Sequence, residues 1–274
     1  MTKRSTSLIR FSLLTPIFVL AISCTNTVEY NVVEEKRVEK LLIEEPNGPE
    51  CQTYIKMPFI STEGNEKQKE LATKINNQVL MEFFYAEGNP QEVMSTFIDN
   101  YIAEYRNERL EDYTIERSIC EDEDTSFLVS AFSANLTIEG TVSTGRDGVI
   151  AYTVLQDIYN GGAHPVTTTH FMNFNPVTGN ELKMADIFIS GSIDTLTNRI
   201  ANAIASDKGV NTIEELQEMG YDNITTPQEF LIGQDSITFY YNVYEIAPYA
   251  LGPTKVSISL QDLNDIMVKD VLAK

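Results

Sequence analysis

The spacing of apolar residues changes along the chain, and this change limits the folds that are open to it. Between residues 65 and 105 apolar residues recur every three or four positions, as in Leu71 and Ile75, which is the period of an amphipathic helix. From Tyr113 to Phe174 they alternate with polar residues, which is typical of half-buried strands. Both patterns return later in the chain. The order predicts an α+β fold in which antiparallel sheets are packed with amphipathic helices.

The individual elements follow from these periods and from turn residues. Pro46-Asn47-Gly48-Pro49 is a strong turn signal, so the strands on either side of it are expected to form a hairpin. Asn89 is a candidate N-cap, with Pro90 in the first turn of the helix that follows. Strands are expected at residues 36–43, 51–60, 113–120, 126–138, 149–159, 167–174, 229–232, 236–242 and 255–260, and helices at residues 65–85, 89–105, 193–204 and 213–219.

The first 23 residues have the pattern of a signal peptide. Three basic residues and no acid lie among the first ten, and Phe11 to Ile22 is almost wholly apolar. A permanent membrane-spanning helix needs about 20 apolar residues, so this stretch is too short to remain as one. We therefore expect residues 1–23 to be removed on export.

Cys24 stands where the apolar stretch ends. The segment from Leu20 to Cys24 resembles a lipobox, in which a small residue precedes a cysteine whose thiol receives diacylglycerol. We expect a lipid on Cys24 that holds the chain on a membrane, followed by a polar tether over residues 24–35. Ordinary signal cleavage after Ser23, which would release a freely secreted protein, is the alternative.

Acidic residues dominate the charge of the chain. Its 20 basic and 40 acidic residues give a net charge of −20, and loss of the leader, which holds three basic residues and no acid, makes this −23. A field of that sign repels phosphate, so nucleic acid is excluded as a partner. The same field attracts cationic ligands, although solubility alone also accounts for it.

Two cysteines, Cys51 and Cys120, remain once Cys24 is acylated. An oxidising compartment allows them to pair, and a disulfide closing so long a loop would stabilise the fold by about 4 kcal/mol. Two buried free thiols are the alternative. Neither cysteine has the C-x-x-C spacing of a redox or zinc site.

Catalytic chemistry is hard to find in the sequence. No nucleophile motif, zinc-protease motif or phosphate-binding glycine loop occurs. The two histidines, His164 and His170, would share a face of a continuous strand and so offer two metal ligands. Gly161, Gly162 and Pro165 interrupt that strand, which favours structural histidines. We therefore assign no catalytic residue, metal or cofactor, and we expect a protein that is not an enzyme.

Aromatic residues are dense between Phe239 and Tyr244, and Tyr249 follows shortly after. Such a cluster suits a surface that stacks on sugars or contacts a protein. The alternative is a strand whose inward-facing rings fill a core.

Two stretches of the second half, read together, resemble an RsiV-type domain. The first is Tyr159-Asn160-Gly161-Gly162-Ala163-His164-Pro165 with the residues up to Phe188, and the second is Tyr241 to Pro253, YNVYEIAPYALGP. Residues 36–148 are similar, in order and pattern, to the domain of unknown function that precedes the catalytic domain of the peptidoglycan deacetylase PdaC. The resemblance divides the chain into residues 36–148 and residues 149–274, as two closely associated domains of a Bacteroidetes-like lipoprotein.

The resemblance implies an extracytoplasmic α+β module without a known catalytic role. In RsiV this module is the outer part of a membrane-spanning anti-sigma factor that senses lysozyme, which is a cationic protein. The present sequence has neither a sigma-binding segment nor a deacetylase domain, so neither of those activities is expected.

The function that we expect is therefore binding in the cell envelope. The ligand would be a lysozyme-like protein or a cell-wall glycan such as peptidoglycan, and the lipid would place the chain on the outer membrane, facing the periplasm. A hydrolase centred on His164 and a structural component of an envelope complex are the alternatives. The residues named for binding are Gly161, Gly162, His164, Tyr244 and Tyr249.

Overall fold

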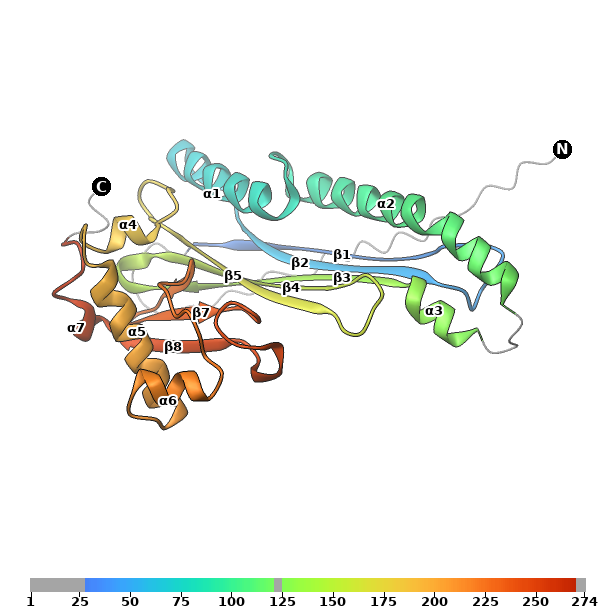
Figure 1. Ribbon diagram of the computed structural model, residues 1–274. Coiled ribbons are helices and arrows are strands. Elements are labelled where there is room, and N and C mark those ends of the chain that lie inside the picture. Colours follow the sequence, from blue (N-terminus) through green and yellow to red (C-terminus); the bar gives the residue numbers. More distant parts are fainter. Residues whose placement is uncertain (1–27, 121–124, 270–274) are drawn as a thin grey trace. The chain divides into compact units, whose positions relative to one another are not determined.

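The computed structural model describes residues 28–120 and 125–269 and has the α+β architecture that the sequence predicts (Figure 1). Cys24 lies outside these residues. One sheet has the strand order β1-β2-β3-β4-β5, and a second sheet has the order β6-β7-β8. The strands are β1 (Tyr30–Lys40), β2 (Glu50–Ile60), β3 (Ala134–Thr144), β4 (Ile150–Tyr159), β5 (Val166–Phe174), β6 (Glu229–Ile232), β7 (Ser236–Tyr241) and β8 (Thr254–Ser259). The helices are α1 (Glu66–Phe84), α2 (Pro90–Ile119), α3 (Ser126–Phe132), α4 (Met184–Ile187), α5 (Ile193–Lys208), α6 (Ile213–Glu218) and α7 (Leu260–Leu263), with short 3-10 turns at η1 (Arg146–Gly148) and η2 (Tyr249–Leu251).

The first two strands form the expected hairpin, but the larger sheet is mixed. β1 pairs with β2 in antiparallel register, ending with Lys40 opposite Glu50. β2 pairs with β3 in parallel, with Cys51 opposite Ala134, whereas wholly antiparallel sheets were expected. The reason is that α1, α2 and α3 lie between these strands in the chain. Their length provides the long crossover that parallel neighbours require.

β1 also begins earlier than expected. The polar residues up to Glu35 predicted a tether over residues 24–35, yet residues 30–35 belong to β1. Val32 and Val33 pair with Pro58 and Met57 of β2. Charged residues are common on strands at the edge of a sheet, where they discourage unwanted pairing, so a polar composition did not exclude a strand here.

The clearest error of the sequence-based prediction lies in the strands expected at residues 113–120 and 126–138. α2 continues to Ile119, and α3 occupies Ser126–Phe132, so that β3 begins only at Ala134. The buried stripe of α2 includes Tyr105 and Tyr113, which are eight residues apart and therefore on one helical face. Apolar residues on the exposed side of the helix produced the false alternation, because a short run of alternating residues does not separate strand from helix.

The other expected elements are confirmed to within a few residues. They include the amide cap of α2, because the side-chain oxygen of Asn89 accepts hydrogen bonds from the backbone N–H groups of Gln91 and Glu92 at 3.0 and 3.2 Å. Pro90 occupies the first turn, where the absence of its N–H costs nothing.

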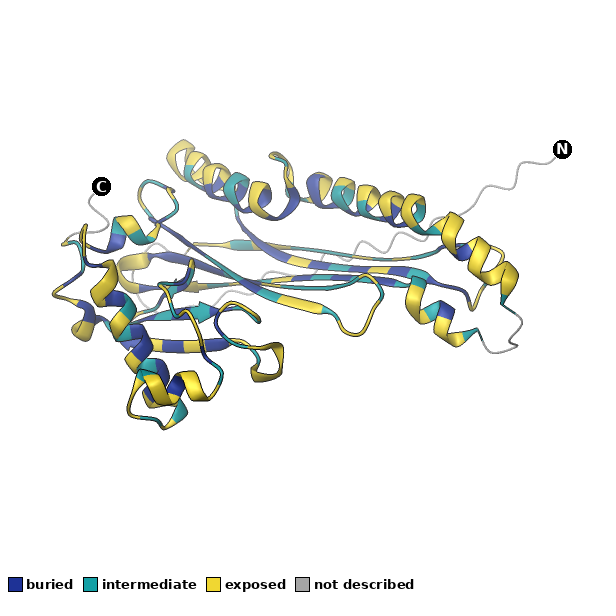
Figure 2. Ribbon diagram, viewed as in Figure 1, coloured by how far each residue is buried: buried dark blue, intermediate teal, exposed yellow. Residues whose placement is uncertain are grey.

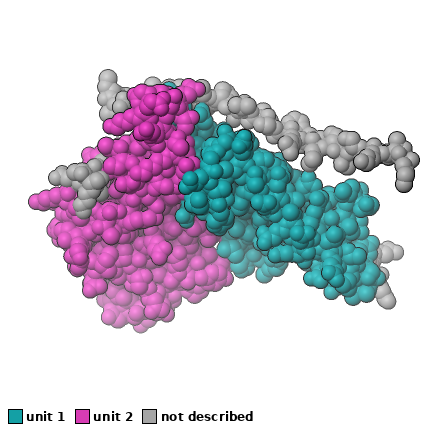
Figure 3. All heavy atoms as spheres, turned by 90° about the horizontal axis from the view of Figure 1, so that it is seen from above, with its two compact units in different colours: residues 1–61, 80–139, 157–166 teal, residues 62–79, 140–156, 167–274 magenta. Residues whose placement is uncertain are grey.

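Contacts divide the chain into two compact units (Figure 3). Within the described part of the chain, unit 1 consists of residues 28–61, 80–120, 125–139 and 157–166, and unit 2 of residues 62–79, 140–156 and 167–269. Each unit is assembled from several segments. The linear division at residue 148 that the sequence suggests stays a prediction.

In unit 1, α2 lies along β1 and β2 (Figure 1). Its buried face carries Met94 and Ile98, and β2 contributes alternate buried residues, including Cys51 and Ile55. The opposite side of α2 is exposed, as the yellow face of this helix in Figure 2 shows. The helix is thus amphipathic in the way that its sequence predicts.

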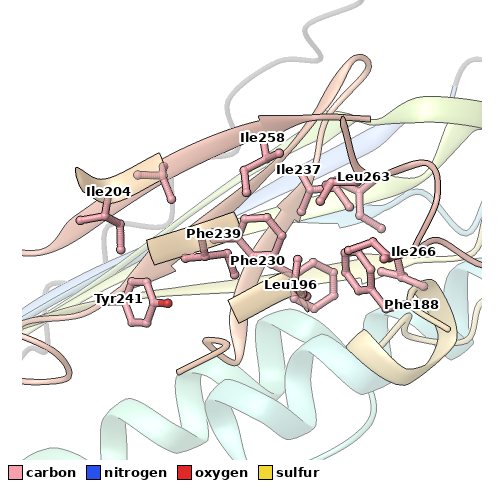
Figure 4. Packing of buried hydrophobic residues seen from close by; sticks show 14 of the residues in the cluster. Phe188, Leu196, Ile204, Phe230, Ile237, Phe239, Tyr241, Ile258, Leu263 and Ile266 are labelled. Carbon is pink, nitrogen blue, oxygen red and sulfur yellow. The ribbon is translucent and has the colours of Figure 1, made fainter. Parts of the chain in front are cut away.

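In unit 2, the core lies between α5 and the sheet β6-β7-β8 (Figure 4). Leu196 and Ile204 of α5 face this core together with Phe239 and Tyr241 of β7, and all four are fully or almost fully buried. Thr238 and Tyr240, which alternate with these two residues of β7, are only half-buried. The aromatic run from Phe239 therefore fills a core with every second ring.

Two further sequence-based questions concern the thiols and the membrane. Cys51 is completely buried, and burial raises the pKa of its thiol to about 12. No disulfide joins Cys51 to Cys120 in the part of the chain that the structure describes. None of the helices at residues 28–120 and 125–269 combines the length and the apolar character needed to cross a membrane.

Candidate binding surface

The glycine turn of the RsiV-type pattern lies in unit 1, where α2 and α3 hold it. Gly161 and Gly162 have φ angles of 78° and 99°, which glycine adopts without strain. The Arg109 guanidinium of α2 donates a hydrogen bond to the carbonyl oxygen of Asn160 at 2.5 Å, and the Tyr101 hydroxyl bonds the Asn160 side chain at 3.0 Å. The backbone of this turn is thus fixed from one side.

Gly161 is also the point of closest approach in this turn. A β-carbon at this position would lie 2.4 Å from the carbonyl oxygen of Ala131, whereas one at Gly162 would meet nothing within 4 Å. The tight contact explains why glycine is needed at the first position. The second position needs glycine only for its backbone angle.

These two positions give a matched pair of substitutions. We expect Gly162→Ala to lower the free energy of unfolding by about 1 kcal/mol because of its left-handed backbone. Gly161→Ala should cost at least about 1 kcal/mol more, because the new methyl group must also displace Ala131. Urea denaturation of both variants measures the difference. Equal losses would show that the close approach to Ala131 has no energetic weight.

His164 lies in the exposed segment between Gly162 and β5, and its Nδ1 is 2.9 Å from the carbonyl oxygen of Pro165. β5 begins at Val166, so His164 and His170 do not belong to one continuous strand. Among the described residues no group of three or more His, Cys, Asp or Glu side chains is placed to hold a metal ion. The two histidines therefore do not share one face of a continuous strand, which was the reason for considering them as a pair of metal ligands.

His170 belongs to a different arrangement, in which side chains join β5 to the smaller sheet within unit 2. Its Nδ1 is 3.1 Å from the Glu229 carboxylate, whose other oxygen accepts the backbone N–H of Phe171 at 2.6 Å. The Asn242 amide accepts from the N–H of Thr169 at 2.7 Å and donates to its carbonyl at 3.1 Å. The side chains of Glu229 and Asn242 thus form hydrogen bonds with backbone groups of β5, as a neighbouring strand would.

Asn173 makes the reciprocal connection from β5 to β6. Its amide nitrogen donates to the carbonyl oxygen of Phe230 at 2.8 Å, and its oxygen accepts the N–H of Ile232 at 2.9 Å. The residue is 1% exposed. Sequence reasoning gave no role of their own to Asn173, Glu229 and Asn242, although an asparagine within the apolar run FMNF is a sign of a buried amide with a specific partner.

The loop from Asn242 to Pro253, which joins β7 to β8 and is called the aromatic loop below, presents two tyrosines to solvent. Tyr244 is 63% exposed and Tyr249 is 38% exposed. Their ring centroids are 5.5 Å apart with the planes tilted by 33°. Leu251 in η2 is exposed as well. The loop thus offers an aromatic and apolar surface that the core does not use.

The backbone of the aromatic loop is fixed beneath these rings. Ile246 is buried, and its carbonyl oxygen accepts the N–H of Asp222 at 2.9 Å. Tyr244 has a φ of 70°, a conformation that is costly for a residue with a β-carbon. Beside it, burial raises the pKa of the Glu245 carboxyl, while bonds from Asn242 act in the opposite direction. Strain held in this way is common at binding loops.

The two tyrosines and the glycine turn lie in stretches that known families share. Residues 45–167 match the family model described as deacetylase PdaC, and residues 185–261 match the one described as a protein of unknown function, DUF3298. The chain is thus similar to the PdaC-type family and, after it, to the DUF3298 family, which confirms the resemblance drawn from the sequence motifs in the families and their order. The aromatic loop falls in the DUF3298 match, but the glycine turn, which the sequence placed at the start of the RsiV-type domain, falls in the PdaC match.

Solved structures agree with this assignment. A crystal structure of a DUF3298 family member from Bacteroides fragilis is 26% identical, with a TM-score of 0.79, over 90% of this chain and 96% of that one. A DUF3298 family protein from Pseudomonas aeruginosa is 14% identical, with a TM-score of 0.59, over 90% and 97% of the two chains, and shares the fold. No curated protein matches the chain.

Proposed function

We propose that this protein is a non-catalytic binding module of the bacterial cell envelope and that its ligand is a cationic protein of the lysozyme type. The observation that carries the proposal is the pair of exposed tyrosines, Tyr244 and Tyr249, on the aromatic loop. Tyrosines contribute strongly to protein interfaces, because they bury a large area at a small cost in conformational entropy. The fixed backbone beneath them reduces that cost further.

Charge supports a cationic partner. The full chain carries −20. On α2, Glu104, Glu108, Asp112 and Glu116 are exposed and follow one another at intervals of four residues, so they form a row of like charges. Each neighbouring pair in such a row destabilises a helix by about 0.2–0.5 kcal/mol. An acidic surface of this kind accelerates the approach of a positively charged protein.

The binding test compares the double variant Tyr244→Ala/Tyr249→Ala with the unchanged protein. We expect affinity for hen-type lysozyme, measured by titration calorimetry, to fall by about 30-fold or more, because exposed aromatic anchors contribute about 2 kcal/mol. Tyr85→Ala is the matched control, since Tyr85 is 80% exposed and has a φ of 58°. This control should leave affinity unchanged.

Two further measurements separate the possible ligands. Affinity for lysozyme should fall as salt rises, because screening weakens the attraction between the two charges. Sedimentation with purified peptidoglycan is the second arm. Retention on peptidoglycan alone, lost in the double variant, would assign the tyrosines to a glycan instead, and retention of neither ligand would refute the proposal.

The same proposal places the protein on the outer membrane, facing the periplasm, through a lipid on Cys24. Its support is the sequence pattern around this residue. We expect Cys24→Ser to move the protein from the membrane fraction to the soluble fraction of the envelope, because the acyl chains supply the affinity for the bilayer. Leader cleavage without lipidation would leave both proteins soluble, and this outcome would contradict the anchor.

A further inference from the structure

The strand β1 has a neighbour on one side only in the part of the chain that the structure describes. Two backbone hydrogen bonds at the ends of β1 show which of its residues direct their N–H and C=O groups toward β2. The carbonyl oxygen of Glu29 accepts the N–H of Ser61, and the N–H of Leu41 bonds to Pro49. Because backbone groups alternate in direction along a strand, the odd-numbered residues face β2. The N–H and C=O groups of the even-numbered residues therefore face the open edge. One of them, the carbonyl oxygen of Lys40 at the end of the strand, already accepts a hydrogen bond from Arg106 of α2 at 3.1 Å.

The same even-numbered residues have their side chains on the face of the sheet away from α2. The odd-numbered Arg37 bonds Ser95 of α2 at 2.6 Å, and Glu39 bonds Arg106 of α2 at 3.1 Å. On the other face, Val32 and Val38 are 44% and 48% exposed. Two β-branched residues are thus left in solvent on an eleven-residue edge strand, where pairing with another chain would cover them.

The even-numbered side chains of β1 are complementary to the same side chains of a second copy that runs in the opposite direction. They are, in sequence, Tyr30, Val32, Glu34, Lys36, Val38 and Lys40. An antiparallel copy that places Glu34 opposite Lys36 also places Val32 opposite Val38. We infer that the open edge of β1 pairs with the same edge of a second copy of this chain, in this register, to form a two-fold dimer with one continuous sheet.

Charge selects this register over its neighbours. A shift by two residues in one direction places Glu34 opposite Glu34, and a shift in the other places Lys36 opposite Lys36. Like charges directly opposite each other destabilise a strand pair, whereas opposite charges contribute about 0.2–1 kcal/mol. A shift by one residue would direct the wrong backbone groups at the partner.

One pair of like charges opposes the dimer, and hydrogen bonds within each copy weaken its repulsion. The two-fold axis brings Glu35 opposite Glu35 of the second copy. The carboxylate of Glu35 accepts hydrogen bonds from the Arg37 Nε at 3.0 Å and from the Gln91 amide at 3.3 Å. Arg37, which also pairs with Asp99, offsets part of this charge, so the repulsion across the axis is reduced.

Charge reversal on β1 tests the inference, with sedimentation of the full-length chain over a range of concentrations as the measurement. Glu34→Lys and Lys36→Glu should each weaken the dimer by about 10-fold or more, because each creates two like-charge pairs per dimer. The double variant Glu34→Lys/Lys36→Glu should restore it. Lys255→Glu on the exposed face of β8 is the matched control, with the same change in net charge as Lys36→Glu, and should behave as the unchanged chain.

Glu34→Lys also separates pairing from net charge, because it makes the chain less acidic and would by that effect alone promote association. Cross-linking fixes the register. Glu35→Cys should give a disulfide-linked dimer on mild oxidation, since residue 35 faces itself, whereas Val33→Cys should not. A monomeric unchanged chain at all concentrations, failure of the double variant to restore the dimer, or equal cross-linking at both positions would overturn the inference. None of these outcomes depends on the ligand of the aromatic loop.

Discussion

Replacing Asn173 with alanine is expected to lower the free energy of unfolding by about 2–5 kcal/mol. The side chain is 1% exposed and satisfies two backbone groups of β6, the carbonyl oxygen of Phe230 and the N–H of Ile232. Alanine would leave both groups without their partner in a buried place. Each such loss costs about 1–3 kcal/mol, because the group gave up its hydrogen bond to water on folding.

Asn242 is the matched control for this prediction. Its amide also makes two hydrogen bonds to backbone groups, both of them on Thr169, but the residue is only half-buried. Water can replace the lost amide more readily there, so Asn242→Ala should cost about 1 kcal/mol. Denaturant unfolding of the two variants decides the matter. If both lost the same stability, burial of the Asn173 side chain would not be what makes its bonds important.

The arrangement around Asn173 also shows where prediction from the sequence ended. Helix and strand periods identified most elements, because each of them buries one face and repeats at its own interval. The partners of a side-chain amide are set by elements far apart in the chain, such as residues 173 and 230. No local pattern encodes that distance, so the joint between β5 and the smaller sheet was not foreseen.

The failures among the secondary-structure predictions have a common cause. At Tyr113 and beyond, apolar residues on the exposed side of α2 imitated alternation, and at β1 charged residues concealed a strand. In both places the tertiary environment decided, because one face of the element is in solvent and constrains the sequence weakly. Buried elements such as β7 were predicted correctly, since both their length and their period are fixed by the core.

The sequence named Tyr244 and Tyr249 as binding residues and offered a buried strand as the alternative for the aromatic cluster. The buried strand is found for Phe239 and Tyr241, whereas Tyr244 and Tyr249 are exposed and their role in binding stays a proposal. The positive φ of Tyr244 was not predictable, since no glycine or asparagine marks that position.

Phe239 provides the second prediction with a large expected effect. Its ring is fully buried in the core of unit 2, where Phe239 pairs with Phe230 of β6 and Val256 of β8. Phe188 lies on another side, with 6.4 Å between the two ring centroids. Replacement by alanine removes the ring and leaves a cavity among these neighbours. We expect a loss of about 3–5 kcal/mol in the free energy of unfolding.

Thr238→Ala is the control on the same strand. Thr238 faces the opposite side of β7, where its hydroxyl bonds the Ser257 hydroxyl at 2.8 Å. Loss of this exposed bond should cost at most about 1 kcal/mol. Guanidinium denaturation monitored by circular dichroism measures both variants, and the midpoint should move far more for Phe239→Ala. A small effect at Phe239 would mean that the surrounding side chains collapse into the cavity, which the close packing of this sheet against α5 opposes.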